Sequence, residues 1–424
     1  MTSTDESMLD DLDKQAAHHR IPGGQVGWLR NGQKLQWSYG IRDVDSGDSV
    51  GSTTPFPIGS LSKPWVAAMA MILANDEGLH PDDPLDEFFP GTAFSLRQLL
   101  SHNAGFPTHL QGPGSTPSEW ARFAVRPEVL AKPGRWSAYS SAGIVTAAAL
   151  VEHLSGMSWF EATREFLAEP LGINLGLARD RSDSARGHLA RSDGGWACVE
   201  PVTHPAVEDA AGGLALSAAG MIAFIEAGLA GAGPFSLPDE QREALVTDQV
   251  CTVEQPEDVG RRWSAWSLQV VGEPDSGQLI LDCFLDGIVA NLRCVPHTGE
   301  VLTMFTNGDQ GDKLWRDTHD LLGGKEADQA TGVVGEPALP IVAVPEEALG
   351  VFADGTDVVE VARDGGETHL QLDGFTLARM DWHENGRFTL MHPSRGSLGR
   401  GGYLRMSDGE EVLFLAGRVA RRGK

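Results

Sequence analysis

The stretch FPIGSLSKPW, residues 56–65, decides how the rest of the chain is interpreted. Ser60 lies three residues before Lys63, and Ser62 lies directly before it. Residues three apart on a helix share one face, so Ser60 and Lys63 can meet while Ser62 points elsewhere. The stretch therefore predicts either a nucleophile with its base or, as the plainer alternative, a serine helix cap followed by a solvated lysine.

Several features of the surrounding sequence favour the nucleophile. Residues 60–77 predict a mostly apolar helix closed by Gly78, and a helix that is apolar all round is buried. Burial favours the neutral amine that a lysine needs to act as a base. At the helix start the N–H of Ser60 is expected to be unpaired and free to hold an oxyanion. The motif is weak alone, but Lys63 is the only one of seven lysines with a serine three residues earlier.

The charge of the chain limits its partners. With 33 basic and 59 acidic residues the net charge is −26, which repels nucleic acid and anionic membranes. No apolar run is expected to reach the roughly 18 residues of a membrane span. The opening, MTSTDESMLDDLDKQ, is acidic and lacks the basic-then-apolar order of a signal peptide. We therefore expect no nucleic acid and no membrane as partners, and a cytoplasmic protein.

The cysteines and histidines do not predict a metal centre. The four cysteines (Cys198, Cys251, Cys283 and Cys294) have no metal-finger spacing, and no H-E-x-x-H motif occurs. We expect four reduced thiols, no bound metal and no cofactor.

The order of helix and strand signals predicts an α+β fold. Two strand-like runs flank Asn31-Gly32, a strong hairpin signal, after an opening helix of about ten residues. Further strands are expected after residue 262, so that strands at both ends of this region enclose the helices. Their first and last strands should meet in one antiparallel sheet with helices packed on it. The helices between them are predicted at 60–77, 96–100, 138–154, 157–168 and 217–230.

The last part of the chain predicts a second domain. Residues 326–345 are rich in Gly, Pro and Ala and are interpreted as a linker. Residues 346–424 alternate short strand signals with D-G, N-G and G-G turns, which is typical of a small β-barrel or sandwich. The predicted division is therefore a catalytic domain over 1–325, the linker over 326–345 and a small β-barrel domain over 346–424.

Several motifs together resemble those of a known superfamily. The chain resembles the serine β-lactamase and penicillin-binding-protein superfamily, in its class C, esterase and D-peptidase branch, over about residues 15–320. The resemblance implies the β-lactamase/transpeptidase-like fold, an antiparallel sheet flanked by helices with an all-helical subdomain. The motifs, in order, are FPIGSLSKPW (56–65), LRQLLSHNAGF (96–106), KPGRWSAYSSAGIVTAAALVEHLSGMSW (132–159), EPLGI (169–173) and AAGGLALSAAGMIAF (210–224).

The resemblance implies three catalytic residues. Ser60 would be the acylated nucleophile, Lys63 its general base, and Tyr139, which opens the Y-x-N motif, would exchange protons with leaving group and acceptor. From the residue alone, a phenol near Lys63 could shuttle a proton. The alternative for Tyr139 is a core aromatic.

Two departures from the family pattern concern substrate binding. The family's asparagine after the tyrosine is Ser141 here, a shorter hydroxyl. The third motif of the family carries a lysine or histidine on a strand, and that position falls near Leu281 in LILDCFLDG (279–287). The HTG at 297–299 is interpreted as a turn, with His297 outside the site. Asp282 and Phe284 are predicted to bind substrate, and an N–H near Phe284 to complete the oxyanion hole.

Within the superfamily the chain looks most like penicillin-binding-protein-type thioesterases and transacylases of antibiotic biosynthesis, such as that of the capuramycin pathway. The features are NLRCVP (291–296), GDKLWRD (311–317) and the LGVFADGTDVVEV tail (349–361), which is similar to a lipocalin-like domain. This likeness implies a serine acyltransferase that forms an amide from a small-molecule or peptidyl ester or thioester donor and an amine acceptor, with a carrier protein as a further candidate partner. The alternatives are an esterase or D-amino-acid amidase or peptidase, and a non-catalytic penicillin-binding-like protein.

Overall fold

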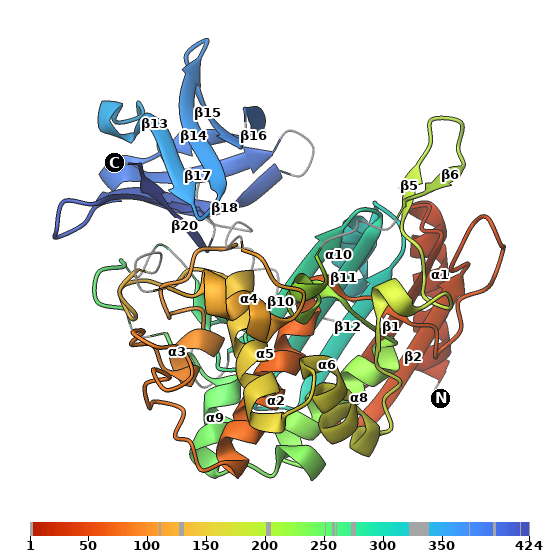
Figure 1. The fold of residues 1–424 in the computed structure, drawn as a ribbon. Coiled ribbons are helices and arrows are strands. Elements are labelled where there is room, and N and C mark those ends of the chain that lie inside the picture. The colour runs from red at the N-terminus through yellow and green to blue at the C-terminus, as the bar shows by residue number, and fades with distance from the viewer. Residues whose placement is uncertain are drawn as a thin grey trace.

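The computed structural model divides the described chain into a sheet-and-helix part and a β-barrel (Figure 1). In the view of Figure 1 the barrel lies above the helices. The described residues are 3–109, 112–126, 131–200, 205–250, 252–256, 259, 261–272, 277–321, 339–372, 374–392, 396–415 and 417–423.

Seven antiparallel strands form the main sheet, in the order β2-β1-β12-β11-β10-β9-β8. Strand β1 pairs with β12, with Gly24 opposite Thr306, so the prediction that the first and last strands meet is confirmed. The strands are β1 (Gly23–Arg30), β2 (Gln33–Gly40), β8 (Arg262–Trp263), β9 (Gln269–Val271), β10 (Gln278–Leu285), β11 (Ile288–Val295) and β12 (Glu300–Thr306).

The predicted hairpin at Asn31-Gly32 is also confirmed. Both residues have positive φ angles, 51° and 72°, as a two-residue turn between twisted antiparallel strands requires.

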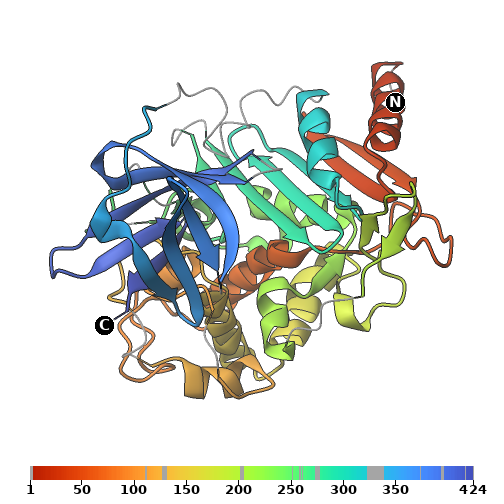
Figure 2. The same ribbon diagram turned by 90° about the horizontal axis from the view of Figure 1, so that it is seen from above.

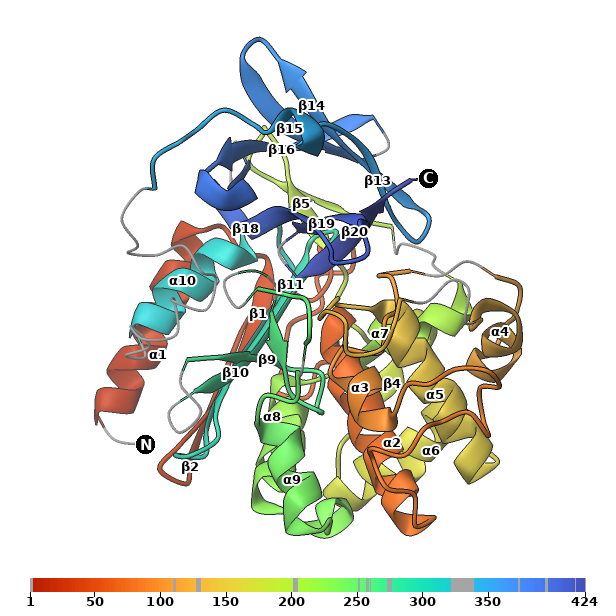
Figure 3. The ribbon, with the colours of Figure 1, turned by 90° about the vertical axis from the view of Figure 1, so that its left-hand side faces the viewer.

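Helices cover both faces of the sheet (Figure 3). Helix α1 (Ser3–His18), longer than the predicted ten residues, and α10 (Gly311–Leu321) lie on one face. The other face packs on α8 and the remaining helices, and these side chains form the largest hydrophobic core. The helices on this face are α2 (Lys63–Asp76), α3 (Leu96–Leu100), α4 (Pro117–Ala124), α5 (Ser141–Ser155), α6 (Trp159–Thr163), α7 (Asp209–Gly212), α8 (Ala218–Ala230) and α9 (Asp239–Val246).

Two helices differ from the helices predicted from the sequence. The helix predicted from 138 begins at Ser141, because Ser140 is extended and its hydroxyl caps the Gly143 N–H. The helix predicted over 157–168 is α6 followed by a π-helical turn, Arg164–Ala168.

One segment contradicts the expectation that no apolar run reaches the length of a membrane span. Ala218–Phe235 is long and apolar enough to cross a membrane by length and composition. The same test is passed by core helices of soluble proteins, and α8 packs on β1 and β12 with Met221, Phe224 and Ile225 in the main core. We therefore interpret this segment as a core helix.

Short strands support the turn that leads into α2. Strand β3 (Phe56–Pro57) pairs with β7 (Leu214–Leu216), which also pairs with β4 (Gly176–Leu177). A separate hairpin joins β5 (His188–Ala190) and β6 (Trp196–Cys198).

The predicted barrel is confirmed as eight antiparallel strands that close on themselves (Figure 2). The residues 326–338 of the predicted linker lie outside the described residues, and 339–345 contain no helix or strand. The division of the chain at 325 and 345 stays a prediction. The barrel strands are β13 (Gly350–Asp354), β14 (Asp357–Asp364), β15 (Glu367–Leu372), β16 (Phe375–Trp382), β17 (Arg387–His392), β18 (Gly396–Arg405), β19 (Glu411–Leu415) and β20 (Arg418–Arg422).

Candidate active site

The hydroxyl of Ser60 receives two hydrogen bonds from the other two predicted catalytic residues. Lys63 Nζ lies 3.1 Å from Ser60 Oγ, and the Tyr139 hydroxyl donates to the same oxygen over 2.8 Å. Ser60 lies in a 3₁₀ turn, Gly59–Ser62, that runs directly into α2. Side chains three apart eclipse in a 3₁₀ turn, so the predicted meeting of Ser60 and Lys63 occurs although the α-helix begins later than predicted.

Ser62 has a structural contact instead. Its hydroxyl accepts a hydrogen bond from the Leu214 N–H over 3.0 Å, on strand β7. This contact turns Ser62 away from Lys63, as the spacing predicts.

Lys63 is buried, with 1% of its surface exposed. Its Nζ also donates to the Ala211 carbonyl over 2.7 Å and lies 4.9 Å from the centre of the Tyr139 ring. Pro64 occupies the first turn of α2, where its missing N–H costs little. The amine is therefore held between nucleophile and phenol by fixed neighbours.

The ring of Tyr139 packs against two others. Trp263 lies 5.3 Å away and His102 4.9 Å away, measured between ring centres. His102 Nδ1 accepts the N–H of Ser140 over 3.2 Å. Burial, and then the charge of Lys63, lower the pKa of His102 to about 3, so its ring is neutral near pH 7. Sequence reasoning gave His102 no role, although it lies in a quoted family motif.

The N–H of Ser60 is not unpaired, which corrects the prediction of a free oxyanion donor. It donates to the sulfur of Cys283 over 3.3 Å. Burial raises the pKa of the Cys283 thiol, although the bonds from Ser60 and the charge of Lys63 oppose this effect, so the group here is a neutral thiol. Gly59 makes room for it: a Cβ there would lie 2.3 Å from the sulfur. A substrate oxygen bound by the Ser60 N–H must displace this thiol.

Strand β10 presents different side chains to its two sides. Cys283 lies against the Ser60 turn, whereas its neighbour Asp282 points to the opposite face of the sheet. There Asp282 binds Arg293 through both carboxylate oxygens, at 2.7 and 2.9 Å, and Asn291 at 2.7 Å. Burial would raise the pKa of Asp282, but Arg293 and Asn291 hold it below its usual value. The structure thus does not bring Asp282 to Ser60.

The remaining predicted residues lie on α5, on β10 and in the turn after β11. Phe284 is 51% exposed near the end of β10, and a role for an N–H near it stays a prediction. Ser141 is the first residue of α5, and its N–H donates to the Thr108 carbonyl over 2.9 Å. Leu281 is buried in the main core, so an apolar side chain stands near the expected basic position. His297 lies exposed in the turn between β11 and β12, as predicted.

A half-buried arginine near Tyr139 was not predicted from the sequence. Arg261 precedes β8, and its side chain packs on Gly417 of the barrel. Burial lowers the pKa of Arg261, and the charge of Arg418 adds to this effect, while Asp282 and Tyr139 oppose it. Arg261 therefore places positive charge close to Tyr139.

Two groups of possible metal ligands come together among the described residues: Asp43 with His188 and Cys198, and His80 with Asp82 and Glu240. In the first, His188 Nε2 accepts the N–H of Val44, and Asp43 pairs with Arg186. The second is exposed, and its Asp82 pairs with Arg97. Because these ligand atoms already have protein partners, we assign no metal centre to either group.

Most of this chain is similar to known proteins. A model of the Beta-lactamase family matches residues 9–323. Penicillin-binding protein 4 of Amycolatopsis lactamdurans is 25% identical over 356 residues, which cover 78% of this chain and 92% of that protein.

Solved structures extend the similarity to the barrel. The crystal structure of SurE superposes with a TM-score of 0.82 at 27% identity, over 99% of both chains, and SurE with D-Leu gives 0.79 at 26%. D-amino acid amidase from Ochrobactrum anthropi SV3, at 18% identity and a TM-score of 0.60, covers 77% of this chain and shares the fold.

Proposed function

The chain belongs to the beta-lactamase family, and we propose that it is a serine acyltransferase that transfers an acyl group from an ester or thioester to an amine. The observation that carries this proposal is the contact of Ser60 Oγ with both Lys63 Nζ and the Tyr139 hydroxyl. A hydroxyl held by two groups that can take and return a proton is an activated nucleophile.

The proposed reaction has two steps. Ser60 Oγ attacks the donor carbonyl, its proton passes to Lys63 or Tyr139, and the leaving alcohol or thiol departs with a proton from the same pair. The amine then attacks acyl-Ser60, loses a proton to this pair, and releases the amide as Ser60 is reprotonated. Each proton taken in one half of the cycle is returned in the other, so no cofactor is required.

The likeness to SurE supports the choice of substrates. It includes both the catalytic part and the barrel, and one SurE structure contains D-Leu. We propose a peptidyl or other small-molecule ester or thioester donor that ends in an amino acid, with a carrier protein as a candidate partner. We also propose that the protein acts without nucleic acid or membrane partners, because its net charge of −26 repels both.

The proposal is tested by trapping the acyl-enzyme. The protein is incubated with the N-acetylcysteamine thioester of N-acetyl-D-leucine, and its intact mass is followed. We expect one acyl adduct on the wild type and on Ser62→Ala, and none on Ser60→Ala. Absence of an adduct on the wild type with this thioester and with activated esters would support the non-catalytic binding protein instead.

The fate of the adduct separates transfer from hydrolysis. Amines of different charge and size are added, and the products are analysed for amide and free acid. Amide in excess over acid supports the acyltransferase, because aminolysis requires a site that binds the amine and excludes water. Free acid alone, with every amine, would identify an esterase or amidase of the same family.

A further inference from the structure

The hairpin that closes the barrel reaches the backbone of Tyr139. The carbonyl of Gly417, in the turn between β19 and β20, accepts the Tyr139 N–H over 2.7 Å. Gly417 has a φ of 101°, and a Cβ there would lie 2.7 Å from the Cδ of Arg261. The close approach of barrel and tyrosine therefore requires glycine.

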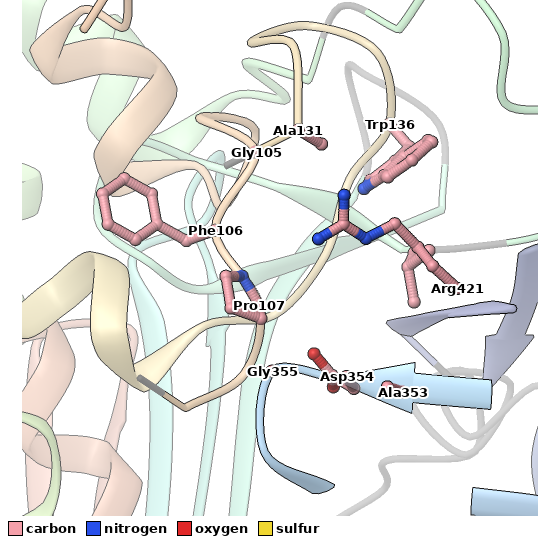
Figure 4. A pocket seen from close by; sticks show the side chains of 10 residues that line it. Gly105, Phe106, Pro107, Ala131, Trp136, Ala353, Asp354, Gly355 and Arg421 are labelled. Atoms are coloured by element: carbon pink, nitrogen blue, oxygen red, sulfur yellow. The ribbon is translucent and has the colours of Figure 1, made fainter. Parts of the chain in front are cut away.

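A second barrel residue holds the loop beside the tyrosine. Asp354 ends β13, is 5% exposed, and accepts hydrogen bonds from the N–H and hydroxyl of Thr108 over 2.8 and 2.6 Å. Figure 4 shows Asp354 facing the loop that contains Gly105 and Pro107. Burial raises the pKa of this carboxyl, and the two donors of Thr108 oppose that effect. Thr108 is thus the partner that makes a carboxylate acceptable at this buried position.

Thr108 in turn contacts the chain on both sides of Ser140. Its hydroxyl oxygen lies 3.2 Å from the Tyr139 carbonyl, and its own carbonyl accepts the N–H groups of Ser141 and Ala142 over 2.9 and 3.2 Å. The first N–H groups of a helix have no partner within that helix, so Thr108 fixes the start of α5. The barrel therefore fixes Tyr139 directly through Gly417, and indirectly through Asp354 and Thr108.

We infer that the barrel is a working part of the active site, in which Asp354, acting through Thr108, and Gly417 are positioning residues that hold the Tyr139 hydroxyl at Ser60. This inference rests on the proposed function, because it assigns the barrel a part in the acylation of Ser60. Proton transfer depends on donor and acceptor remaining within hydrogen-bond reach, so small shifts of the Tyr139 backbone reduce the rate.

Other contacts attach the barrel independently of Asp354. Arg135 pairs with Asp408 and Glu410 of the barrel at 2.8 and 2.6 Å, and Trp136 packs edge-on against Phe414. A substitution at Asp354 is therefore expected to shift the tyrosine without releasing the barrel.

The test compares two barrel aspartates. In Asp354→Asn the amide cannot accept from both donors of Thr108, and we expect a roughly tenfold slower acylation of Ser60 by the D-leucyl thioester, with an unchanged half-saturating concentration. The matched control is Asp381→Asn, since Asp381 pairs with Arg379 on its own strand, β16. The control is expected to acylate at the wild-type rate. Wild-type kinetics for Asp354→Asn, or a loss confined to the half-saturating concentration, would overturn the inference.

A second pair of variants covers a failure of Asp354→Asn to fold. Thr108→Val removes the hydroxyl at constant shape and should lose rate as Asp354→Asn does, whereas Thr108→Ser retains the hydroxyl and should restore most of it. Equal acylation rates for Thr108→Val and Thr108→Ser would overturn the inference. If the wild type itself forms no acyl-Ser60, the proposed function fails first, and that outcome is distinct from a wild type that reacts and variants that match it.

Discussion

The two sides of the Ser60 hydroxyl differ in chemistry. On the helix side, Lys63 and Tyr139 both reach its oxygen, and each is held by buried neighbours. On the strand side, β10 offers the thiol of Cys283 and apolar Leu281, near the expected basic position. In the proposed reaction, the groups that move protons are therefore separate from the strand that is expected to receive the substrate. The first follows the family pattern, and the second does not.

The largest loss should follow from removal of the amine on the helix side. Lys63→Met keeps the length of the buried side chain but leaves Ser60 without its nitrogen partner. We expect Ser60 acylation to slow by about 10³-fold, within the range of a lost general base. Intact-mass measurements at successive times after addition of the thioester check this rate. A loss below tenfold would mean that Tyr139 alone activates Ser60.

Loss of the phenol hydroxyl should have the next largest effect. Tyr139→Phe keeps the ring packing on Trp263 and His102, so thermal unfolding should be unchanged. Acylation should slow by about 10²-fold, because the proton can still pass through Lys63. If deacylation by amines slows less than acylation, the roles of the phenol in the two steps differ. Wild-type rates in both steps would remove Tyr139 from the mechanism.

On the strand side, removal of the Cys283 thiol is expected to raise the acylation rate slightly. Cys283→Ala frees the Ser60 N–H from its sulfur partner, so the substrate oxygen displaces nothing. We expect acylation to rise by about twofold to fivefold, the contribution of one hydrogen bond. Cys294→Ala, which removes another buried thiol, on β11, is the control. A tenfold fall specific to Cys283 would contradict this and show that the thiol assists the reaction.

The smallest effect should come from the histidine of the HTG stretch. His297 is exposed in the turn at the end of β11, whereas the contact between Cys283 and Ser60 lies toward the other end of the β10–β11 hairpin. His297→Ala should therefore acylate within about twofold of the wild type, as surface substitutions usually do. The same kinetic assay measures this rate. A large loss of rate would show that His297 takes part in the reaction.

Local signals accounted for much of the fold and for the centre of the site. The Asn31-Gly32 turn, the apolar helix after Ser60 and the helix predicted over 217–230 all depend on residues within a few turns of each other, and each is confirmed. The spacing of Ser60 and Lys63 predicted their contact for the same reason. The meeting of β1 with β12 followed from the order of strands rather than from a local signal.

What sequence reasoning missed depends on contacts between distant segments. The Cys283 sulfur at the Ser60 N–H, the Arg261 side chain against the barrel and the Gly417 carbonyl at Tyr139 each join elements far apart in the chain. No periodicity or motif contains such pairings. The alternation of side chains along β10 was available, and it could have placed Asp282 on the face opposite Cys283.

The contact between Gly417 and Tyr139 also concerns the order of folding. Ser60, Lys63 and Tyr139 belong to the first part of the chain, whereas Gly417 lies in the last hairpin of the barrel. Contacts of long sequence separation carry a large loop-closure cost and form late. During refolding we therefore expect the helices and their core to form before the tyrosine is fixed, so that acylation activity returns only when the barrel closes.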